Sequence, residues 1–187
     1  PGLSGGSETY ARALARALGG VGVHTYEAFA PRTAPDAGSG LPTRVAGGVP
    51  ARPGATGRLR SMAGLALRHG ELRAELDAAD VVHYPLTVPV PPVSGPTVVT
   101  LHDLQHRDLP RLFDPATRAF RRLAYDRAAR RATHVIVISE WTRGRAIEAL
   151  GLEPARVHTV PLGVDHDRFS PDPAVEREPF LLYPARP

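Results

Sequence analysis

A histidine and an aspartate follow the most strand-like stretch of this sequence. The run Thr97–Leu101 is short and β-branched and follows the turn-forming pair Gly95–Pro96, which favours a buried strand over a helix. His102 and Asp103 come directly after it, at the strand end where open α/β sheets bind their ligands. Imidazole exchanges protons near neutral pH, so His102 is a candidate catalytic residue. The alternative is a histidine that only caps the strand through hydrogen bonds to nearby backbone.

A second candidate site is the glycine pair Gly5–Gly6, which precedes a helical pattern over Thr9–Leu18. We expect Ser7 to cap this helix and Gly19–Gly20 to end it. A glycine loop that opens a helix presents unpaired N–H groups to an anion, and the helix dipole acts in the same direction. The loop is neither the six-residue dinucleotide fingerprint nor a phosphate loop with lysine. A plain turn therefore remains the alternative.

Strand and helix patterns alternate along the rest of the chain. Further strands are predicted over residues 22–29, 43–46, 80–84, 133–138 and 157–161, and helices over residues 58–76 and 116–132. Another helix runs to Leu150, with Ser139 as its N-cap and Gly151 as its stop. This alternation predicts an α/β fold, with a Rossmann-like parallel sheet and helices on both faces.

Composition excludes several classes of protein. The 187 residues contain no cysteine, so neither a disulfide framework nor a thiolate metal site is available. No apolar run approaches the ~18 residues that a membrane-spanning helix needs. The formal net charge is +4, and every cation is an arginine, which suits phosphate recognition but is also typical of a GC-rich genome.

The helix predicted over residues 116–132 has a basic face. Its arginines are Arg118, Arg121, Arg122, Arg130 and Arg131. Such a face can bind an anionic membrane or a nucleic acid, although a solvated surface is the ordinary explanation. We expect the solvated surface and no nucleic-acid partner.

The domain organisation follows from composition shifts. We predict a Rossmann-like domain over residues 1–170, a Pro-rich interdomain linker over residues 171–179 and the start of a second domain over residues 180–187. The sequence opens directly on the glycine loop, without an initiator methionine. We therefore expect that the first strand of the domain lies upstream and that the chain is an excised segment.

Five segments occur in an order that is characteristic of one family. They are residues 5–8 (GGSE), 98–103 (VVTLHD), 135–142 (VIVISEWT), 157–165 (VHTVPLGVD) with 169–171 (FSP), and 180–186 (FLLYPAR). On these segments the chain resembles the N-terminal half of the GT-B glycosyltransferases. The resemblance is specifically to the family-4-like retaining enzymes, which include bacterial mannosyl- and other sugar transferases.

The resemblance implies two Rossmann-like domains that face each other across a cleft, the N-terminal one holding the acceptor and the C-terminal one the nucleotide sugar. Gly5 and Gly6 would approach the donor diphosphate, and Arg186 would be its first basic ligand in the second domain. His102 would lie beside the reacting sugar. We also expect the acceptor side of the cleft to be lined by Asp103, Tyr84, Ser139 and Glu140.

The sequence departs from the family at two positions. The family usually has glycine where this chain has Ala185, and often asparagine where it has Leu162. The paired glutamates that bind the donor in the family lie beyond Pro187. We therefore expect this segment alone to be inactive.

The expected activity is transfer of a hexose, mannose being the preferred candidate, from a nucleotide diphosphate sugar to a glycan or lipid-linked acceptor with retention. We expect no cofactor and no obligatory metal. The expected location is the cytoplasm, with peripheral contact to the anionic inner face of the plasma membrane as a possibility. The alternatives are a GT-B sugar-nucleotide epimerase, a basic nucleic-acid-binding module, and a dinucleotide-dependent oxidoreductase. The last lacks the acidic ribose ligand at its expected spacing.

Overall fold

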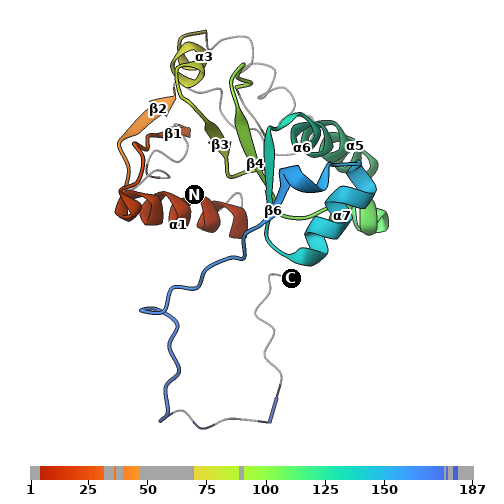
Figure 1. Ribbon diagram of the computed structural model, residues 1–187. Helices are drawn as coiled ribbons and strands as arrows, with labels where there is room; N and C mark the ends of the chain where they lie inside the picture. Colours follow the sequence, from red (N-terminus) through yellow and green to blue (C-terminus); the bar gives the residue numbers. More distant parts are fainter. Residues whose placement is uncertain are drawn as a thin grey trace.

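A computed structural model describes residues 5–31, 36, 40–46, 70–88, 91–174, 176 and 179–180. Within these ranges every strand pairing is parallel, in one sheet of two strands and one of four (Figure 1). The strands are β1 Ala28–Pro31, β2 Thr43–Ala46, β3 Val82–Tyr84, β4 Thr97–Leu101, β5 His134–Val137 and β6 Val157–Thr159. The predicted parallel α/β class is confirmed, with the strands divided between two sheets.

Helices connect these strands. They are α1 Gly6–Val21, α3 Gly70–Asp77, α4 Gln105–Asp108, α5 Pro115–Arg121, α6 Arg127–Arg131 and α7 Glu140–Leu150, with short turns η1 Pro110–Leu112, η2 Arg122–Asp126 and η3 Pro154–Arg156. The α5, η2 and α6 segments are continuous, so the helix predicted over residues 116–132 is confirmed, with a π-helical turn in its middle. For the helix predicted over residues 58–76, residues 58–69 lie outside the described ranges. None of the helices in the described ranges is long and apolar enough to cross a membrane.

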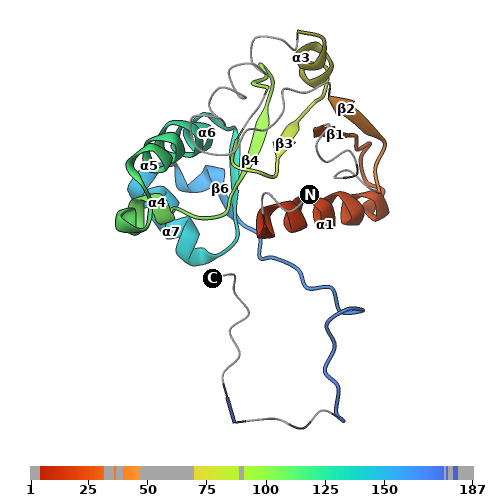
Figure 2. The same ribbon diagram turned by 180° about the vertical axis from the view of Figure 1, so that it is seen from behind.

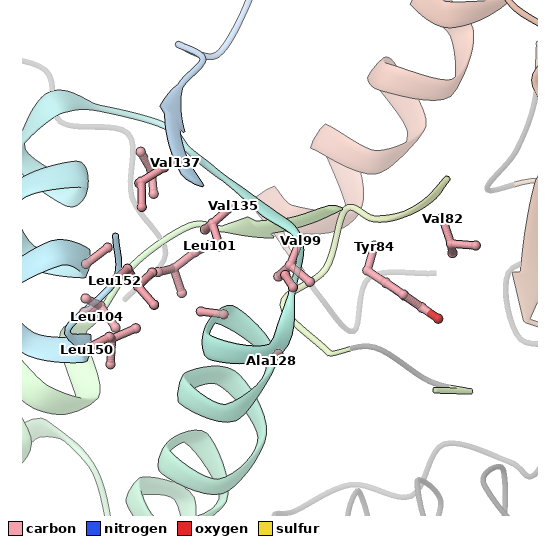
Figure 3. Packing of buried hydrophobic residues seen from close by; sticks show 14 of the residues in the cluster. Val82, Tyr84, Val99, Leu101, Leu104, Ala128, Val135, Val137, Leu150 and Leu152 are labelled. Atoms are coloured by element: carbon pink, nitrogen blue, oxygen red, sulfur yellow. The ribbon is translucent and has the colours of Figure 1, made fainter. Parts of the chain in front are cut away.

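The four-stranded sheet is covered on both faces. Val99 and Leu101 of β4 point to one face and pack in one hydrophobic cluster with Ala128 of α6 and Leu150 of α7 (Figure 3). Thr100 points to the opposite face, because successive strand residues alternate, and contacts α1 there. Helices on both faces are therefore confirmed for this sheet.

Strand β4 lies inside the four-stranded sheet, between β3 and β5. Its last residue, Leu101, pairs with Val137 at the end of β5, and both side chains are fully buried. The carboxyl ends of β4 and β5 therefore lie side by side. Whatever follows these two strands meets at a common sheet edge.

Helix α1 differs from its prediction at both ends. It begins at Gly6 with Gly5 as N-cap, so Ser7 lies inside the helix and the predicted Ser7 cap is wrong. It runs to Val21 and ends at Gly22, so the prediction that Gly19–Gly20 stops it is also wrong. The strand predicted over residues 22–29 begins later, as β1 at Ala28, after the helix cap at Gly22.

Gly19 has a packing function instead. A Cβ at this position would lie 2.3 Å from the carbonyl oxygen of Gly40. Only glycine lets the backbone of the segment before β2 approach α1 this closely.

The predicted basic face is only partly outward. The Arg121 guanidinium pairs with Asp103 and lies over the Phe113 ring. Arg130 donates from Nε to the Leu150 carbonyl. The expectation that all five arginines form one free face is therefore corrected: Arg121 and Arg130 hold neighbouring elements together.

Candidate functional site

His102 lies just beyond β4, at the shared carboxyl edge. Its ring is half-buried, and Nε2 lies 2.9 Å from the carbonyl oxygen of Pro85, which directly follows β3. The imidazole is therefore anchored to the end of the neighbouring strand. The capping interpretation predicts such a bond, but the bond uses only one of the two ring nitrogens.

The Gly5–Gly6 loop reaches the same edge. Gly5 has φ +57°, which favours glycine, and its carbonyl accepts hydrogen bonds from the N–H groups of Glu8 and Thr9. A Cβ on Gly5 or Gly6 would meet no atom of the described residues within 4 Å, so this part of the structure leaves the space beside the loop open. The start of α1 therefore presents backbone to an open space, as an anion site requires.

Tyr10 brings the start of α1 to His102. The two rings meet edge to face, with centroids 5.1 Å apart and planes at 85°. The Tyr10 hydroxyl lies 3.4 Å from Oγ1 of Thr100 in β4. In sequence Tyr10 is one more residue on the inward face of a helix, so this contact could not be predicted from spacing.

Behind Tyr10 lies a polar pair, the half-buried His83 and the buried Thr100, that sequence reasoning missed. Nε2 of His83 in β3 is 2.9 Å from Oγ1 of Thr100, and Thr100 is fully buried. Burial lowers the pKa of His83 to about 4, so the ring is neutral at physiological pH. The available signal was a histidine inside a predicted buried strand.

The carboxylate of Asp103 bonds to two groups of the protein, one in the turn after His102 and one in α5. Its Oδ1 accepts a hydrogen bond from the backbone N–H of Gln105 and pairs with Arg121 at 3.2 Å. Arg121 in turn lies over the rings of Phe113 and Tyr125. Asp103 therefore ties the turn after His102 to α5.

A buried ionic cluster holds the next residues. Nε2 of His106 donates to Oδ1 of Asp126 at 2.8 Å, and Arg107 pairs with the other carboxylate oxygen at 2.6 Å. Burial alone would raise the pKa of Asp126, but these hydrogen bonds outweigh it and hold the pKa below its usual range. The segment that follows His102 is thereby fixed to the π-helical turn η2.

Ser139 and Glu140 come to the same edge from β5. Ser139 caps α7, as predicted: its Oγ accepts a hydrogen bond from the Thr142 N–H at 3.2 Å. Glu140 is exposed in the first turn of α7. Because β5 is the neighbour of β4, both residues start from the strand end next to that of His102.

Tyr84 lies in the hydrophobic cluster instead of on an open surface. Only 8% of it is exposed, and its hydroxyl donates to the Pro91 carbonyl at 2.6 Å. Burial raises its pKa to about 12, with a smaller contribution from Asp77. Its contacts are those of a structural residue that holds the connector after β3.

The structure thus brings Gly5, Gly6, His102 and the Ser139–Glu140 pair to one side of the sheet, where the start of α1 faces the strand ends (Figure 2). Arg186 lies outside the described residues, as do residues 181–187 of the predicted second domain. Among the residues that are described, no group of three or more histidine, aspartate or glutamate side chains could hold a metal ion.

Comparison with known proteins adds one positive finding. No curated protein matches the chain. Residues 4–168 match the family model described as Glycosyltransferase Family 4, and this range runs from the glycine loop past β6. The match covers most of the 187 residues and includes every candidate site residue except Arg186. The chain therefore belongs to glycosyltransferase family 4.

Proposed function

We propose that this chain is the acceptor-side domain of a retaining GT-B glycosyltransferase. The reaction replaces the bond between the anomeric carbon and the diphosphate oxygen of a nucleotide sugar with a bond to an acceptor oxygen, with the anomeric configuration kept. The acceptor is a glycan or a lipid-linked sugar. The donor sugar is a hexose, and mannose is the first to test. A second, C-terminal GT-B domain supplies Arg186 and the remaining donor ligands.

One observation carries this proposal: the start of α1 and His102 meet at a single sheet edge, through the contact between Tyr10 and His102. A diphosphate is an anion that accepts hydrogen bonds. Unpaired backbone N–H groups at the start of a helix donate such bonds, and the helix dipole also favours negative charge there. Glu8 lies in this first turn, but its carboxylate is paired with Arg12 at 3.0 Å. The pairing reduces its repulsion of an anion.

The proposed roles follow from position. Gly5 and Gly6 approach the diphosphate, whose negative charge grows as the bond to the sugar breaks. Stabilisation of such developing charge is where preorganised dipoles contribute most to a rate. His102 contacts the sugar or the acceptor next to that bond, and Ser139 and Glu140 face the acceptor. No step in this scheme requires a metal or another cofactor.

The test is the His102→Ala substitution in the full-length enzyme. If His102 acts as charge develops, turnover should fall by roughly 10²–10⁴-fold. Apparent affinity for substrate should change less, because the lost interaction belongs mainly to the transition state. The thermal midpoint should fall much less than turnover does, because the substitution loses only one hydrogen bond, to Pro85, and one ring contact, with Tyr10.

His134→Ala is the matched control, because His134 is exposed at the amino end of β5, far from the proposed site. Near-normal turnover of His102→Ala, together with a lower melting point, would leave His102 with a capping role only. Product analysis belongs to the same experiment. Transfer with inverted configuration, or an isomerised sugar nucleotide without transfer, would reject the proposed reaction.

We also propose peripheral attachment to an anionic membrane through the outward side of the α5–η2–α6 segment. Arg122 and Arg131 are exposed there, and Leu123 is 53% exposed beside Arg122. Exposed leucine between arginines combines apolar insertion with attraction to anionic headgroups. Such attachment would suit an enzyme with a lipid-linked acceptor.

A further inference from the structure

We propose that His134 and His158 together form a binding site for a divalent transition-metal ion that prefers imidazole ligands, Cu²⁺ or Ni²⁺. The two histidines belong to neighbouring strands, β5 and β6. The proposal does not depend on sugar transfer, because the pair lies away from the sheet edge that holds His102. His134 is the first residue of β5, whereas His102 follows the last residue of β4.

The first step is that both rings lie on the same face of the sheet. Val135 and Val137 of β5 and Val157 of β6 pack in the hydrophobic cluster. Because successive strand residues alternate, His134 and His158 point to the opposite face. Both residues are exposed there, so an ion can reach them from solvent.

The second step is that the two strands bring two ring nitrogens together. Ile136 is the register partner of His158, so His134 is a diagonal neighbour of His158 across the strands. Nδ1 of His134 lies 2.9 Å from Nε2 of His158, and the ring centroids are 5.0 Å apart. Within the described ranges, the other nitrogen of each ring has no hydrogen-bond partner. These outer nitrogens can carry the N–H protons of two neutral imidazoles, which leaves lone pairs on the facing nitrogens.

The third step is that two facing lone pairs need a cation between them. Without one, two acceptors lie in contact and neither has a donor. A proton can fill this position as a hydrogen bond between the rings. A metal ion can replace the proton, because neutral imidazole is the commonest metal ligand in proteins. Metal binding requires the unprotonated nitrogens, so the ion competes best above neutral pH.

The fourth step is that the separation of the nitrogens indicates the class of ion. An imidazole nitrogen lies about 2.0–2.1 Å from a bound transition metal, so two nitrogens at a right angle around the ion are about 2.9 Å apart. The tetrahedral angle of Zn²⁺ sites would place them about 3.3 Å apart. Right angles are typical of the tetragonal geometry of Cu²⁺ and Ni²⁺. Water would fill the remaining positions, since the described residues contain no group of three or more suitable side chains.

Arg156, two residues before His158, is bound to backbone oxygens. Its guanidinium donates to the carbonyl groups of Ala132 and Thr133, just before β5. This pairing limits its repulsion of an ion at the two histidines. A bound ion would link β5 to β6, which pairs with no other strand in the part of the chain that the structure describes.

Calorimetric titration of the tag-free protein with NiCl₂ at pH 7.5 tests the proposal. The wild type should bind Ni²⁺ at this pair. His134→Ala and His158→Ala should each weaken binding by at least about tenfold, because the second nitrogen binds the same ion intramolecularly. His24→Ala is the matched control: His24 is exposed, and its ring lies beside Tyr26 instead of a second histidine, so the affinity should not change.

Equal Ni²⁺ affinity of the wild type and the two β-strand variants would overturn the proposal, as would the absence of saturable binding. Circular dichroism of each variant checks that the fold is kept, as we expect for substitutions of exposed residues. Cu²⁺ should bind more tightly than Ni²⁺ or Zn²⁺, which is the usual order for nitrogen ligands. Tighter binding of Zn²⁺ than of Cu²⁺ would show that the assigned class of ion is wrong.

Nuclear magnetic resonance spectra of the ¹⁵N-labelled protein locate the ion. Paramagnetic Cu²⁺, added at a small fraction of the protein concentration, broadens the signals of nearby backbone amides. We expect the amides of β5 and β6 to broaden in the wild type and to stay sharp in His158→Ala. Broadening that spares these strands, or that persists in His158→Ala, would overturn the assignment. Neither measurement uses sugar transfer, so a failure of the proposed function would leave both tests unaffected.

Discussion

His83 is one residue through which acid should lower the stability of this fold. Its ring is bonded to Thr100, and burial lowers its pKa to about 4. An unfolded chain would hold the same histidine at its ordinary pKa of about 6.5. Between these values the unfolded state binds more protons than the folded state, so stability increases with pH. The contribution of the neutral His83 ring to the free energy of unfolding is at its full value above about pH 6.5 and is lost as the pH falls towards 4.

The prediction is that acid destabilises the wild-type chain more than the His83→Gln variant. From pH 7.5 to pH 5.0 the free energy of unfolding attributable to His83 should fall by about 2 kcal/mol, since one pKa unit corresponds to about 1.4 kcal/mol. Glutamine does not titrate, so the variant should lack this share of the pH dependence. Urea unfolding of both proteins at the two pH values measures it.

Asp126 supplies an internal contrast. The pKa of this carboxyl is lowered, so its contribution to stability is present above its usual range and is lost only at lower pH. Asp126 therefore does not contribute to the change in the free energy of unfolding between pH 5.0 and 7.5, where histidines titrate. Equal slopes for the wild type and His83→Gln in that interval would mean that His83 is not buried as a neutral ring.

At the scale of elements, helix α1 contacts His102 near its first turn and the segment before β2 near its last turns. Its first turn lies beside His102, through Tyr10, and its last turns lie against the segment before β2, through Gly19 and Gly40. The helix therefore depends on two contacts with very different requirements. In the proposed function, the start of the helix must leave its backbone N–H groups accessible to the diphosphate. Near its end, position 19 must lack a side chain so that Gly40 can approach.

Two neighbouring glycines of α1 should respond in opposite ways to alanine. Gly19→Ala would place Cβ 2.3 Å from the Gly40 oxygen, so either the helix or the segment before β2 must shift. We expect a loss of roughly 1–3 kcal/mol in the free energy of unfolding. Gly20→Ala meets no atom of the described part of the chain within 4 Å and should gain up to about 1 kcal/mol from better helix propensity.

Thermal and urea denaturation of the two variants side by side provide the measurement. The pair is its own control, because both changes add one methyl group to the same turn of the same helix. A stabilising Gly19→Ala would show that the contact with Gly40 is not part of the folded state.

At the scale of the whole molecule, α1 and the two-stranded sheet lie at one end, and α5, η2, α6 and α7 lie at the other (Figure 2). The proposed membrane surface belongs to the second end, and the loop proposed to bind the donor diphosphate belongs to the start of α1. Docking through Arg122, Leu123 and Arg131 would therefore leave the loop uncovered.

Binding to anionic vesicles should be salt-sensitive and should weaken in the Arg122→Glu and Arg131→Glu variants. An arginine near an anionic surface contributes about 1 kcal/mol, or about fivefold in partition for each charge removed. Arg16→Glu, an equal charge change on an exposed residue of α1, should have little effect. Vesicle sedimentation with anionic and neutral lipid measures this, and equal partition onto both lipids would leave these arginines as an ordinary solvated surface.

Local chemistry made several features of this protein predictable from sequence. Ser139 and Gly151 bound α7 as expected, because caps and stops act through hydrogen bonds and backbone angles within a few residues. The parallel α/β class followed from the alternation of strand and helix patterns. His102 could be placed at a strand end, since its neighbours Thr97–Leu101 predict the strand.

Local chemistry failed where a distant segment intervened. The sequence predicted that Gly19 stops the helix, but the helix continues past it to Val21. The glycine is needed there because the Gly40 carbonyl oxygen occupies the space that a side chain would take. Tyr84, which the family resemblance implied would line the cleft, is 8% exposed, and its hydroxyl donates to the carbonyl of Pro91, seven residues further along the chain.

The candidate site itself was decided by tertiary structure. Tyr10, His83, Thr100 and His102 come from one helix and two strands, and their contacts depend on strand register and on the placement of α1 against the sheet. Sequence spacing specifies which residues share a face of one element. It does not specify which faces meet, because that choice depends on packing the whole core at once.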